Sequence, residues 1–190
     1  VFVGPYVNIE KFSLKRERLE KNFTQVICIS RLLKQKGVIE FIEVAKKYNL
    51  SGNKIKVNFL LIGEIETKHE DRIDEKYILN AENSNYIKRI DKTNNIKSYL
   101  HQSDILFLQS YREGAPSVII EASADEMPTI GSDEGGVRDL IIDGETGYIT
   151  EVKNIDLAYK AILKLVNDRN LIIKLGKNAY NKIARPVDIN

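Results

Sequence analysis

Short apolar segments alternate with amphipathic segments along most of the chain, and this alternation constrains the fold more than any other feature. Apolar, β-branched runs predict strands, whereas apolar residues spaced three to four positions apart predict helices. We expect strands at 23–30, 57–62, 86–90, 105–108, 129–130 and 147–150, and helices at 37–48, 68–81, 94–102, 116–124, 137–142, 155–167 and 169–184. This order is typical of a mainly parallel sheet covered by helices. The sequence therefore predicts a three-layer α/β sandwich that binds ligands beyond the carboxyl ends of its strands.

The length of the chain fits one domain of this kind. With 190 residues, it can build one substantial core and is short for two domains of ordinary size. We interpret residues 1–22 as the remnant of an interdomain connection, 23–185 as the folded domain and 186–190 as a C-terminal tail, because Pro186 disfavours continuation of the last helix.

Composition and charge argue against several classes of partner. The 29 Lys and Arg residues nearly balance the 27 Asp and Glu residues, so a net charge of +2 gives no general reason to expect nucleic acid. No apolar stretch approaches the roughly 20 residues that span a bilayer, and the first residues lack a signal-peptide pattern, which favours a cytoplasmic location. Cys28 lies in an apolar run and is expected in the core. His69 and His101 are isolated in polar surroundings and are expected at the surface, so no metal site is predicted.

The segment from Arg112 to Glu121 is the strongest candidate for a binding site. It reads R-E-G-A-P-S-V-I-I-E and turns from a buried strand into a helix, with Glu113 at the mouth of the helix and Glu121 more than a turn inside. The first N–H groups of a helix can bind an anion, and a carboxylate can accept hydrogen bonds from both hydroxyls of a ribose. The segment therefore predicts a phosphate held between two carboxylates. The alternative is that Glu113 only caps the helix and Glu121 pairs with a surface lysine.

A basic loop from Arg31 to Gly37 directly follows the first strand. Arg31 offers a planar fork for phosphate oxygens and Lys36 a mobile point charge, a pair suited to neutralising a diphosphate as it leaves. The alternative is an ordinary solvated surface. A third stretch, 132–139, carries the paired glycines Gly135 and Gly136, which permit close approach of a ligand but also suit a plain turn.

Other signatures of nucleotide or acyl chemistry are missing from the sequence. It has no G-x-G-x-x-G after the first strand, no Walker loop and no serine-hydrolase elbow. A dinucleotide oxidoreductase, a P-loop NTPase and an α/β-hydrolase are therefore not expected.

Together these positions resemble the group 1 (family 4) glycosyltransferases of the GT-B fold. The resemblance covers about residues 24–166, and the E-x7-E spacing of Glu113 and Glu121 is its specific part. The other matching positions are Arg31, Lys36, Gly63, Pro128–Gly136 and Gly147. The resemblance implies a Rossmann-like domain that forms one half of a GT-B fold.

The resemblance also implies a role for each matched residue. Arg31 and Lys36 correspond to the basic pair that holds the donor diphosphate, Glu121 to the acid that binds the ribose, and Glu113 to an acid near the donor sugar. Arg31, Lys36 and Glu113 are therefore the implied catalytic residues. The implied donor-binding residues besides Glu121 are Gly63, the segment Gly114, Ala115, Pro116, Ser117 and Val118, and Arg89 and Ile90 in the base-binding loop.

In that family the C-terminal domain binds the nucleotide sugar, the N-terminal domain binds the acceptor, and anomeric configuration is retained without a required metal. The resemblance thus implies the donor-binding half of an enzyme that moves a sugar to a glycan or lipid-linked acceptor in bacterial surface polysaccharide synthesis. A UDP-sugar is the favoured donor, no cofactor is expected, and the domain alone should be inactive. Peripheral association of the full-length enzyme with the inner face of the membrane stays open.

Three positions depart from the family pattern. Glu64 follows Gly63 where a second glycine is frequent, Met127 precedes Pro128 where a glycine is common, and Gln109 occupies a frequent proline position. These departures concern the details of the donor loop and not the fold.

Three alternative functions stay open: a noncatalytic nucleotide-sugar sensor, a GT-B sugar-nucleotide epimerase, and an interaction domain whose charges serve only the surface.

Overall fold

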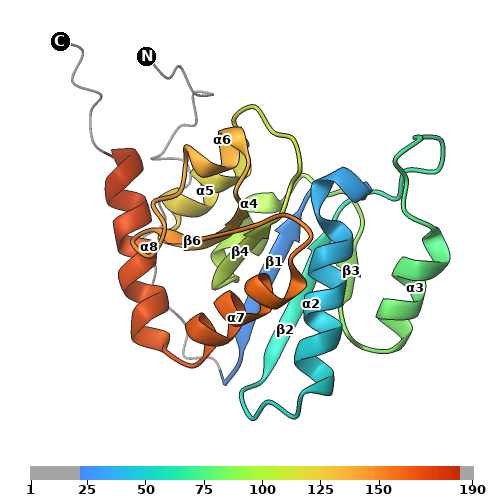
Figure 1. Ribbon diagram of the computed structural model, residues 1–190, viewed down its shortest axis with the longest axis horizontal. Helices are drawn as coiled ribbons and strands as arrows, with labels where there is room; N and C mark the ends of the chain where they lie inside the picture. The colour runs from blue at the N-terminus through green and yellow to red at the C-terminus, as the bar shows by residue number, and fades with distance from the viewer. Residues whose placement is uncertain (1–21, 185–190) are drawn as a thin grey trace.

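The computed structural model describes residues 22–184 and contains one six-stranded sheet in the order β3-β2-β1-β4-β5-β6 (Figure 1). All five pairings between neighbouring strands are parallel, as predicted. The strands are β1 Thr24–Ile29, β2 Val57–Ile62, β3 Lys88–Ile90, β4 Ile105–Leu108, β5 Thr129–Ser132 and β6 Gly147–Thr150. The helices are the 3-10 helix η1 Lys34–Lys36 and the α-helices α2 Val38–Leu50, α3 Glu75–Asn83, α4 Ile96–His101, α5 Ser117–Ala124, α6 Gly135–Arg138, α7 Ile155–Val166 and α8 Arg169–Ala184.

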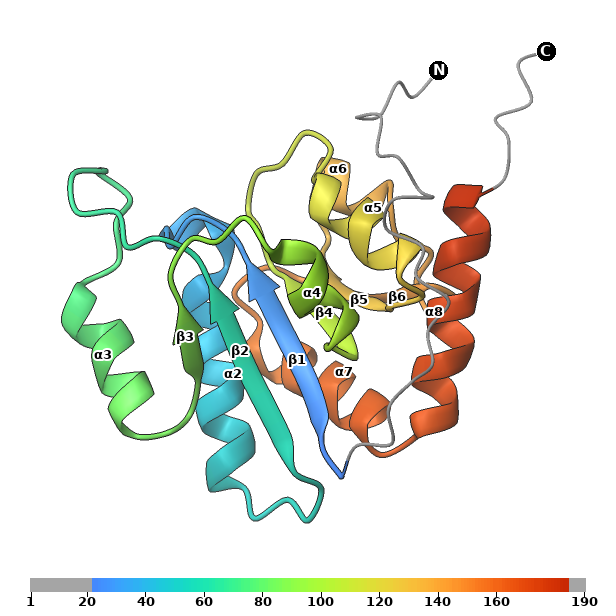
Figure 2. The same cartoon turned by 180° about the vertical axis from the view of Figure 1, so that it is seen from behind.

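Helices cover both faces of the sheet (Figures 1 and 2). Successive side chains of β1 point to opposite faces, so Val26 and Cys28 join one apolar core and Ile27 joins the other. The first core is closed by α2, α3 and α7, and the second by α4, α5 and α6. The predicted Rossmann-like three-layer sandwich is confirmed.

Aromatic packing fixes α2 on the centre of the sheet. The ring of Phe41 lies 5.8 Å from that of Phe59 on β2 and 5.5 Å from that of Phe107 on β4, measured between centroids. Both pairs are tilted or edge-on, the arrangement that aromatic rings prefer. The start of α2 is thereby held above the carboxyl ends of β1 and β4.

Most predicted elements agree with the structure within two residues, but the helix predicted at 68–81 begins only at Glu75. The side chain of Asp74 accepts a hydrogen bond from the backbone N–H of Lys76 at 2.9 Å and caps the helix there. Residues 64–73 instead form a loop that bonds to η1, a contact across the fold that local periodicity does not reveal.

The helix predicted at 137–142 is displaced toward the N-terminus. It occupies Gly135–Arg138, because the carbonyl of Glu134 accepts from the N–H groups of Val137 and Arg138 and closes the first turn earlier. The chain then leaves the helix, and the Thr146 hydroxyl accepts from the N–H of Ile142 at 2.8 Å to form a turn.

Cys28 is fully buried, as predicted, and burial raises the pKa of its thiol to about 12. Both histidines, predicted at the surface, are partly exposed, and each makes a polar contact. His69 Nδ1 accepts from the N–H of Asp71 at 3.0 Å, and His101 Nδ1 lies 3.2 Å from Asp125 Oδ1.

The predicted connection at 1–22 and the predicted tail at 186–190 fall almost entirely outside the described residues, so both stay predictions. Within residues 22–184, no helix is both long enough and apolar enough to span a bilayer.

Candidate functional site

The candidate site lies where the order of the sheet reverses, between β1 and β4. The chain leaves β1 toward α2 on one face and leaves β4 toward α5 on the other. Loops that diverge in this way leave a crevice beyond the carboxyl ends of the strands, where α/β proteins bind ligands. Both of the strongest sequence signals, the basic loop and the acidic segment, lie at this point.

The basic loop is shaped by η1 and by Gly37. Gly37 adopts a left-handed conformation with φ of 71°, and its N–H donates to the carbonyl of Lys34 at 3.0 Å. A Cβ at Gly37 would lie 2.4 Å from the carbonyl oxygen of Gln109. Only glycine satisfies both conditions, so the loop after β1 can press against the end of β4.

Hydrogen bonds fix this loop from both sides. The carbonyl of Gln35 accepts from the N–H of Tyr111 at 2.8 Å and from the Ser110 hydroxyl at 3.1 Å. On the opposite side, Asp71 accepts from the N–H of Gln35 at 2.7 Å through its carboxylate and from the N–H of Lys34 at 3.0 Å through its carbonyl. The loop is thereby held between the segments that follow β2 and β4.

Two predicted catalytic side chains meet directly. Lys36 Nζ lies 2.6 Å from Glu113 Oε1, although the residues are 77 positions apart. The two side chains are 16% and 18% exposed, which leaves both within reach of a ligand while most of each is shielded from water. A charge-assisted contact of this kind is stronger than a neutral hydrogen bond.

The segment 114–118 turns into α5 above this ion pair. Pro116 is the residue before the first turn rather than within it, and its carbonyl accepts from the N–H of Ile119 at 3.1 Å. A Cβ at Gly136 would lie 1.3 Å from the carbonyl oxygen of Gly114, so the two glycine-containing turns are in backbone contact. Since the first N–H groups of a helix lack partners within the helix, this mouth can bind an anion.

Glu121 lies on α5, half-buried beyond the helix mouth. Burial raises the pKa of its carboxyl group, an effect that a hydrogen bond from Ser117 partly offsets. A carboxylate in this position has lost part of its contact with water, so hydrogen bonds from a ligand would stabilise its charged form.

The other predicted site residues lie along the carboxyl edge of the sheet, at or directly after the ends of β1, β2 and β3. Arg31 is exposed at the end of β1, and Gly63 is packed so closely that a Cβ there would lie 2.0 Å from the carbonyl oxygen of Ser30. Arg89 and Ile90 end β3, two strands away from β1 in the sheet. The Arg89 guanidinium is bonded to Glu82, at 3.0 Å, and to Asp91.

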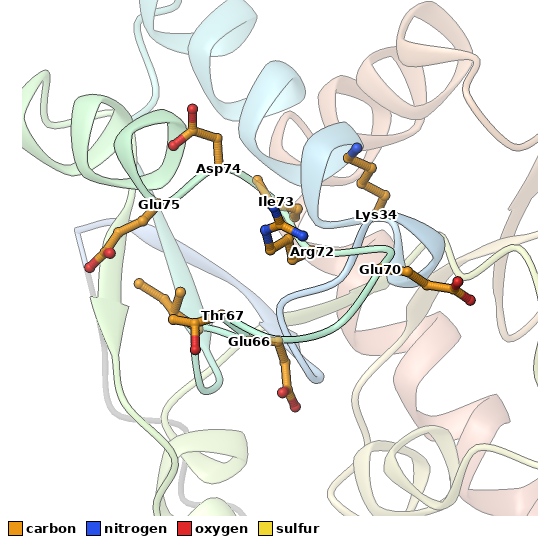
Figure 3. Close-up of a pocket in the computed structure, with 9 residues that line it drawn as sticks. Lys34, Glu66, Thr67, Glu70, Arg72, Ile73, Asp74 and Glu75 are labelled. Atoms are coloured by element: carbon orange, nitrogen blue, oxygen red, sulfur yellow. The ribbon is translucent and has the colours of Figure 1, made fainter.

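Two cavities open beside the site, over the ends of β2 and β3. One, of about 530 Å³, is formed by the loop 65–75 and Lys34, with Arg72 between Lys34 and Thr67 (Figure 3). The other, of about 580 Å³, is lined by Glu64, Ile65, Thr67, Glu75, Arg89, Asp91 and Lys92. Neither is lined by Lys36, Glu113 or Glu121. Lys34 of the basic loop lines the first cavity and the predicted donor-binding residue Arg89 lines the second, so both cavities adjoin the predicted site.

The charged groups at the site suit an anion held by cationic side chains and backbone N–H groups. Within residues 22–184, no three His, Cys, Asp or Glu side chains are grouped so that they could hold a metal ion. Lys36, Arg31 and the mouth of α5 supply the positive character.

Sequence reasoning missed Glu40 and Tyr111, whose side chains hydrogen-bond behind the ion pair. A signal existed for one of them. Glu40 lies among the apolar residues of α2 and is 4% exposed, and an acid on the apolar face of a helix indicates a buried partner.

Comparison with known proteins places the chain in a family. Residues 10–182 match the family model of the glycosyl transferases group 1. The capsular polysaccharide biosynthesis glycosyltransferase CapM of Staphylococcus aureus is 30% identical over 93% of this chain and 47% of its own length. The chain thus spans about half the length of this relative.

Two solved structures are similar as well. A variant of S. aureus TarM in complex with fondaparinux, alpha-GlcNAc-glycerol and UDP has a TM-score of 0.73 and 28% identity, over 90% of this chain and 34% of TarM. The C-terminal domain of the group 1 glycosyl transferase LpcC of Francisella tularensis has a TM-score of 0.72 and 23% identity, over 98% of this chain and 96% of that domain. The chain belongs to the group 1 glycosyltransferases.

Proposed function

We propose that the chain is the donor-binding, C-terminal half of a retaining family 4 glycosyltransferase of the GT-B fold. The observation that carries this proposal is the meeting of Lys36 and Glu113 at 2.6 Å, beside the mouth of α5 and at the reversal point of the sheet. The LpcC domain, which the chain matches along 96% of its length, is itself a C-terminal domain. That match supports the assignment to the C-terminal half.

The reaction breaks the bond between the anomeric carbon and the diphosphate of a nucleotide sugar. Negative charge then builds on the diphosphate, and Arg31, Lys36 and the N–H groups at the start of α5 are placed to stabilise it. Charged and polar groups that are already oriented stabilise a transition state without reorganising. With two cationic side chains available, the proposed reaction uses no divalent ion.

The remaining residues would orient the donor. Glu121 accepts hydrogen bonds from the ribose hydroxyls, Glu113 contacts the sugar, and the backbone of 114–118 faces sugar hydroxyls and phosphate. The base would lie toward β3, where Arg89 lines a cavity. Because Glu82 and Asp91 hold the Arg89 guanidinium, we propose that Arg89 shapes the wall of the base site rather than binding phosphate.

The comparisons suggest the setting of the enzyme. TarM has been solved with UDP, which supports a UDP-sugar as donor, and CapM takes part in capsular polysaccharide biosynthesis, which supports a glycan or lipid-linked acceptor. The acceptor would be held by a second, N-terminal domain, since the chain spans 47% of CapM. We place the full-length enzyme in the cytoplasm, with the membrane face as the site of a lipid-linked acceptor.

A product assay of the full-length protein tests this function against its alternatives. UDP-sugars labelled in the sugar are incubated with and without a lipid-linked glycan acceptor. Label that moves to the acceptor with its anomeric configuration retained supports the proposal. A changed sugar nucleotide without acceptor would identify an epimerase, and nucleotide binding without any product would identify a sensor.

A further inference from the structure

Two side-chain contacts join the same two segments of the chain, one behind the other. In the outer contact, Lys36 from the basic loop meets Glu113 from the segment after β4. In the inner contact, Glu40 from the first turns of α2 accepts a hydrogen bond from the hydroxyl of Tyr111. Glu40 follows Lys36 by four residues, and Tyr111 precedes Glu113 by two. The two contacts therefore lie next to each other and join the same pair of segments.

The inner contact is the more deeply buried of the two. Glu40 is 4% exposed, and its second carboxylate oxygen, Oε2, has no hydrogen-bond partner within the described part of the chain. The hydroxyl of Tyr111 therefore supplies a donor that this buried carboxylate strongly needs. Loss of that donor would leave the buried carboxylate of Glu40 without a hydrogen bond. Because this costs free energy, the hydrogen bond holds the two residues in their present positions.

Tyr111 is fixed by three independent contacts. Its N–H donates to the carbonyl of Gln35 at 2.8 Å, its hydroxyl donates to Glu40, and Lys153 Nζ lies 5.0 Å from the centre of its ring. Its backbone position is thus tied to the basic loop, and its side chain is tied to α2. Glu113 lies two residues further on and takes its position from this anchor.

We propose that Glu40 and Tyr111 are positioning residues that set the distance between Lys36 and Glu113. The inference rests on the proposed function, because the positioned pair matters for transfer only if it contacts the donor. In this arrangement the buried hydrogen bond fixes the spacing of two segments. The partly exposed ion pair, which a ligand must reach, is set by that spacing. Misplacement of reacting groups by about 1 Å can lower a rate about a hundredfold, so loss of the contact between Glu40 and Tyr111 should lower turnover strongly.

The chain offers a matched control on the same helix. Tyr77 on α3 donates its hydroxyl to Glu43 of α2 at 2.5 Å, which repeats the Tyr–Glu contact three residues further along. This second contact joins α2 to α3 and does not involve Lys36, Tyr111 or Glu113, although Tyr77 also interacts electrostatically with Glu40. Tyr77→Phe therefore removes a hydrogen bond of the same kind and leaves the contact between Glu40 and Tyr111 in place.

The test compares Tyr111→Phe, Glu40→Gln and Tyr77→Phe in the full-length enzyme. We expect Tyr111→Phe to lower kcat by roughly ten- to a hundredfold while the KM for the donor changes less, because orientation rather than binding is lost. Glu40→Gln keeps an acceptor oxygen for Tyr111 and should retain kcat within about threefold. Tyr77→Phe should leave kcat unchanged.

Crystal structures of the same variants supply a readout that does not depend on activity. In Tyr111→Phe the distance between Lys36 Nζ and Glu113 Oε1 should exceed 4 Å, and in Tyr77→Phe it should stay near 2.6 Å. If the pair separates but no variant or wild-type protein transfers sugar, the positioning role stands and the proposed function falls. An unchanged pair in Tyr111→Phe, or an equal loss of kcat in Tyr77→Phe, would overturn the inference.

Discussion

Lys36 Nζ lies 2.6 Å from Glu113 Oε1, so a positive charge from the loop after β1 and a negative charge from the segment after β4 partly neutralise each other. On the proposed function, a bound diphosphate competes with Glu113 for Lys36. The carboxylate then becomes available to sugar hydroxyls. One ion pair thereby links recognition of the two halves of the donor.

Removal of either basic side chain should slow transfer more than it weakens binding. Arg31→Ala and Lys36→Ala in the full-length enzyme should each lower kcat by about a hundredfold, because their charge matters most as the diphosphate leaves. Steady-state kinetics with a UDP-sugar measures this. Lys34→Ala is the matched control, since Lys34 lies in the same loop but lines the neighbouring cavity and should keep wild-type kcat. Unchanged turnover in both site variants would remove the proposed role of the basic loop.

The two adjacent glycines of α6 should respond differently to alanine. In Gly136→Ala the new Cβ would lie 1.3 Å from the carbonyl oxygen of Gly114, whereas a Cβ at Gly135 would lie 3.9 Å from the carbonyl oxygen of Glu113, the nearest atom outside the helix and its flanking residues. Gly136→Ala should therefore lower the free energy of unfolding by about 1–3 kcal/mol and displace the turn before α5. Gly135→Ala should change it by less than about 0.5 kcal/mol. Urea unfolding of both variants measures the difference, and equal effects would contradict the close packing of the two turns.

Strands that are buried on both faces were predictable from the sequence because their signals are local. The apolar run at 57–62 ends at Gly63 and the run at 105–108 is bounded by polar residues, and both strands occupy those residues in the structure. The start of α3 was not predictable in this way. Asp71 bonds to Lys34 and Gln35, and these contacts across 36 or more positions hold the preceding loop away from the helix.

In the candidate site, too, features set by local sequence were predictable and features set by contacts between distant residues were not. Motif spacing identified Lys36 and Glu113 separately, and the parallel sheet explains why both lie at one edge. Their direct contact, however, depends on the close approach of Gly37 to Gln109, which no local pattern predicts. Tyr111 was missed because its partner Glu40 lies 71 positions away.

Stability should depend on pH through Glu121. Burial raises the pKa of its carboxyl group in the folded state above the ordinary value of 4.5, so the unfolded chain releases this proton at lower pH. The contribution to stability is present below the ordinary pKa and is lost as the pH rises through the raised value. The free energy of unfolding of the wild type, relative to Glu121→Gln, should therefore fall as the pH rises from below 4.5 through the raised pKa of Glu121. Urea unfolding across this range measures it, and a difference independent of pH would show that Glu121 is not perturbed.

Nucleotide binding should show the opposite dependence. An ionised Glu121 accepts hydrogen bonds from two hydroxyls, whereas its protonated form accepts less well, so acidification through the raised pKa should weaken binding. Titration of UDP at several pH values measures this, with Glu121→Gln as the reference that removes the contribution of phosphate protonation. Parallel pH profiles of the two proteins would argue against a contact between Glu121 and the ribose.

Calorimetric titration of the full-length protein with UDP, GDP and ADP in EDTA measures whether this domain holds a nucleoside diphosphate. We predict that one diphosphate, UDP, binds without a divalent ion and that Glu121→Ala weakens its binding by about 1–3 kcal/mol. No binding of any of the three at millimolar concentration, or equal affinity in Glu121→Ala, would contradict the account.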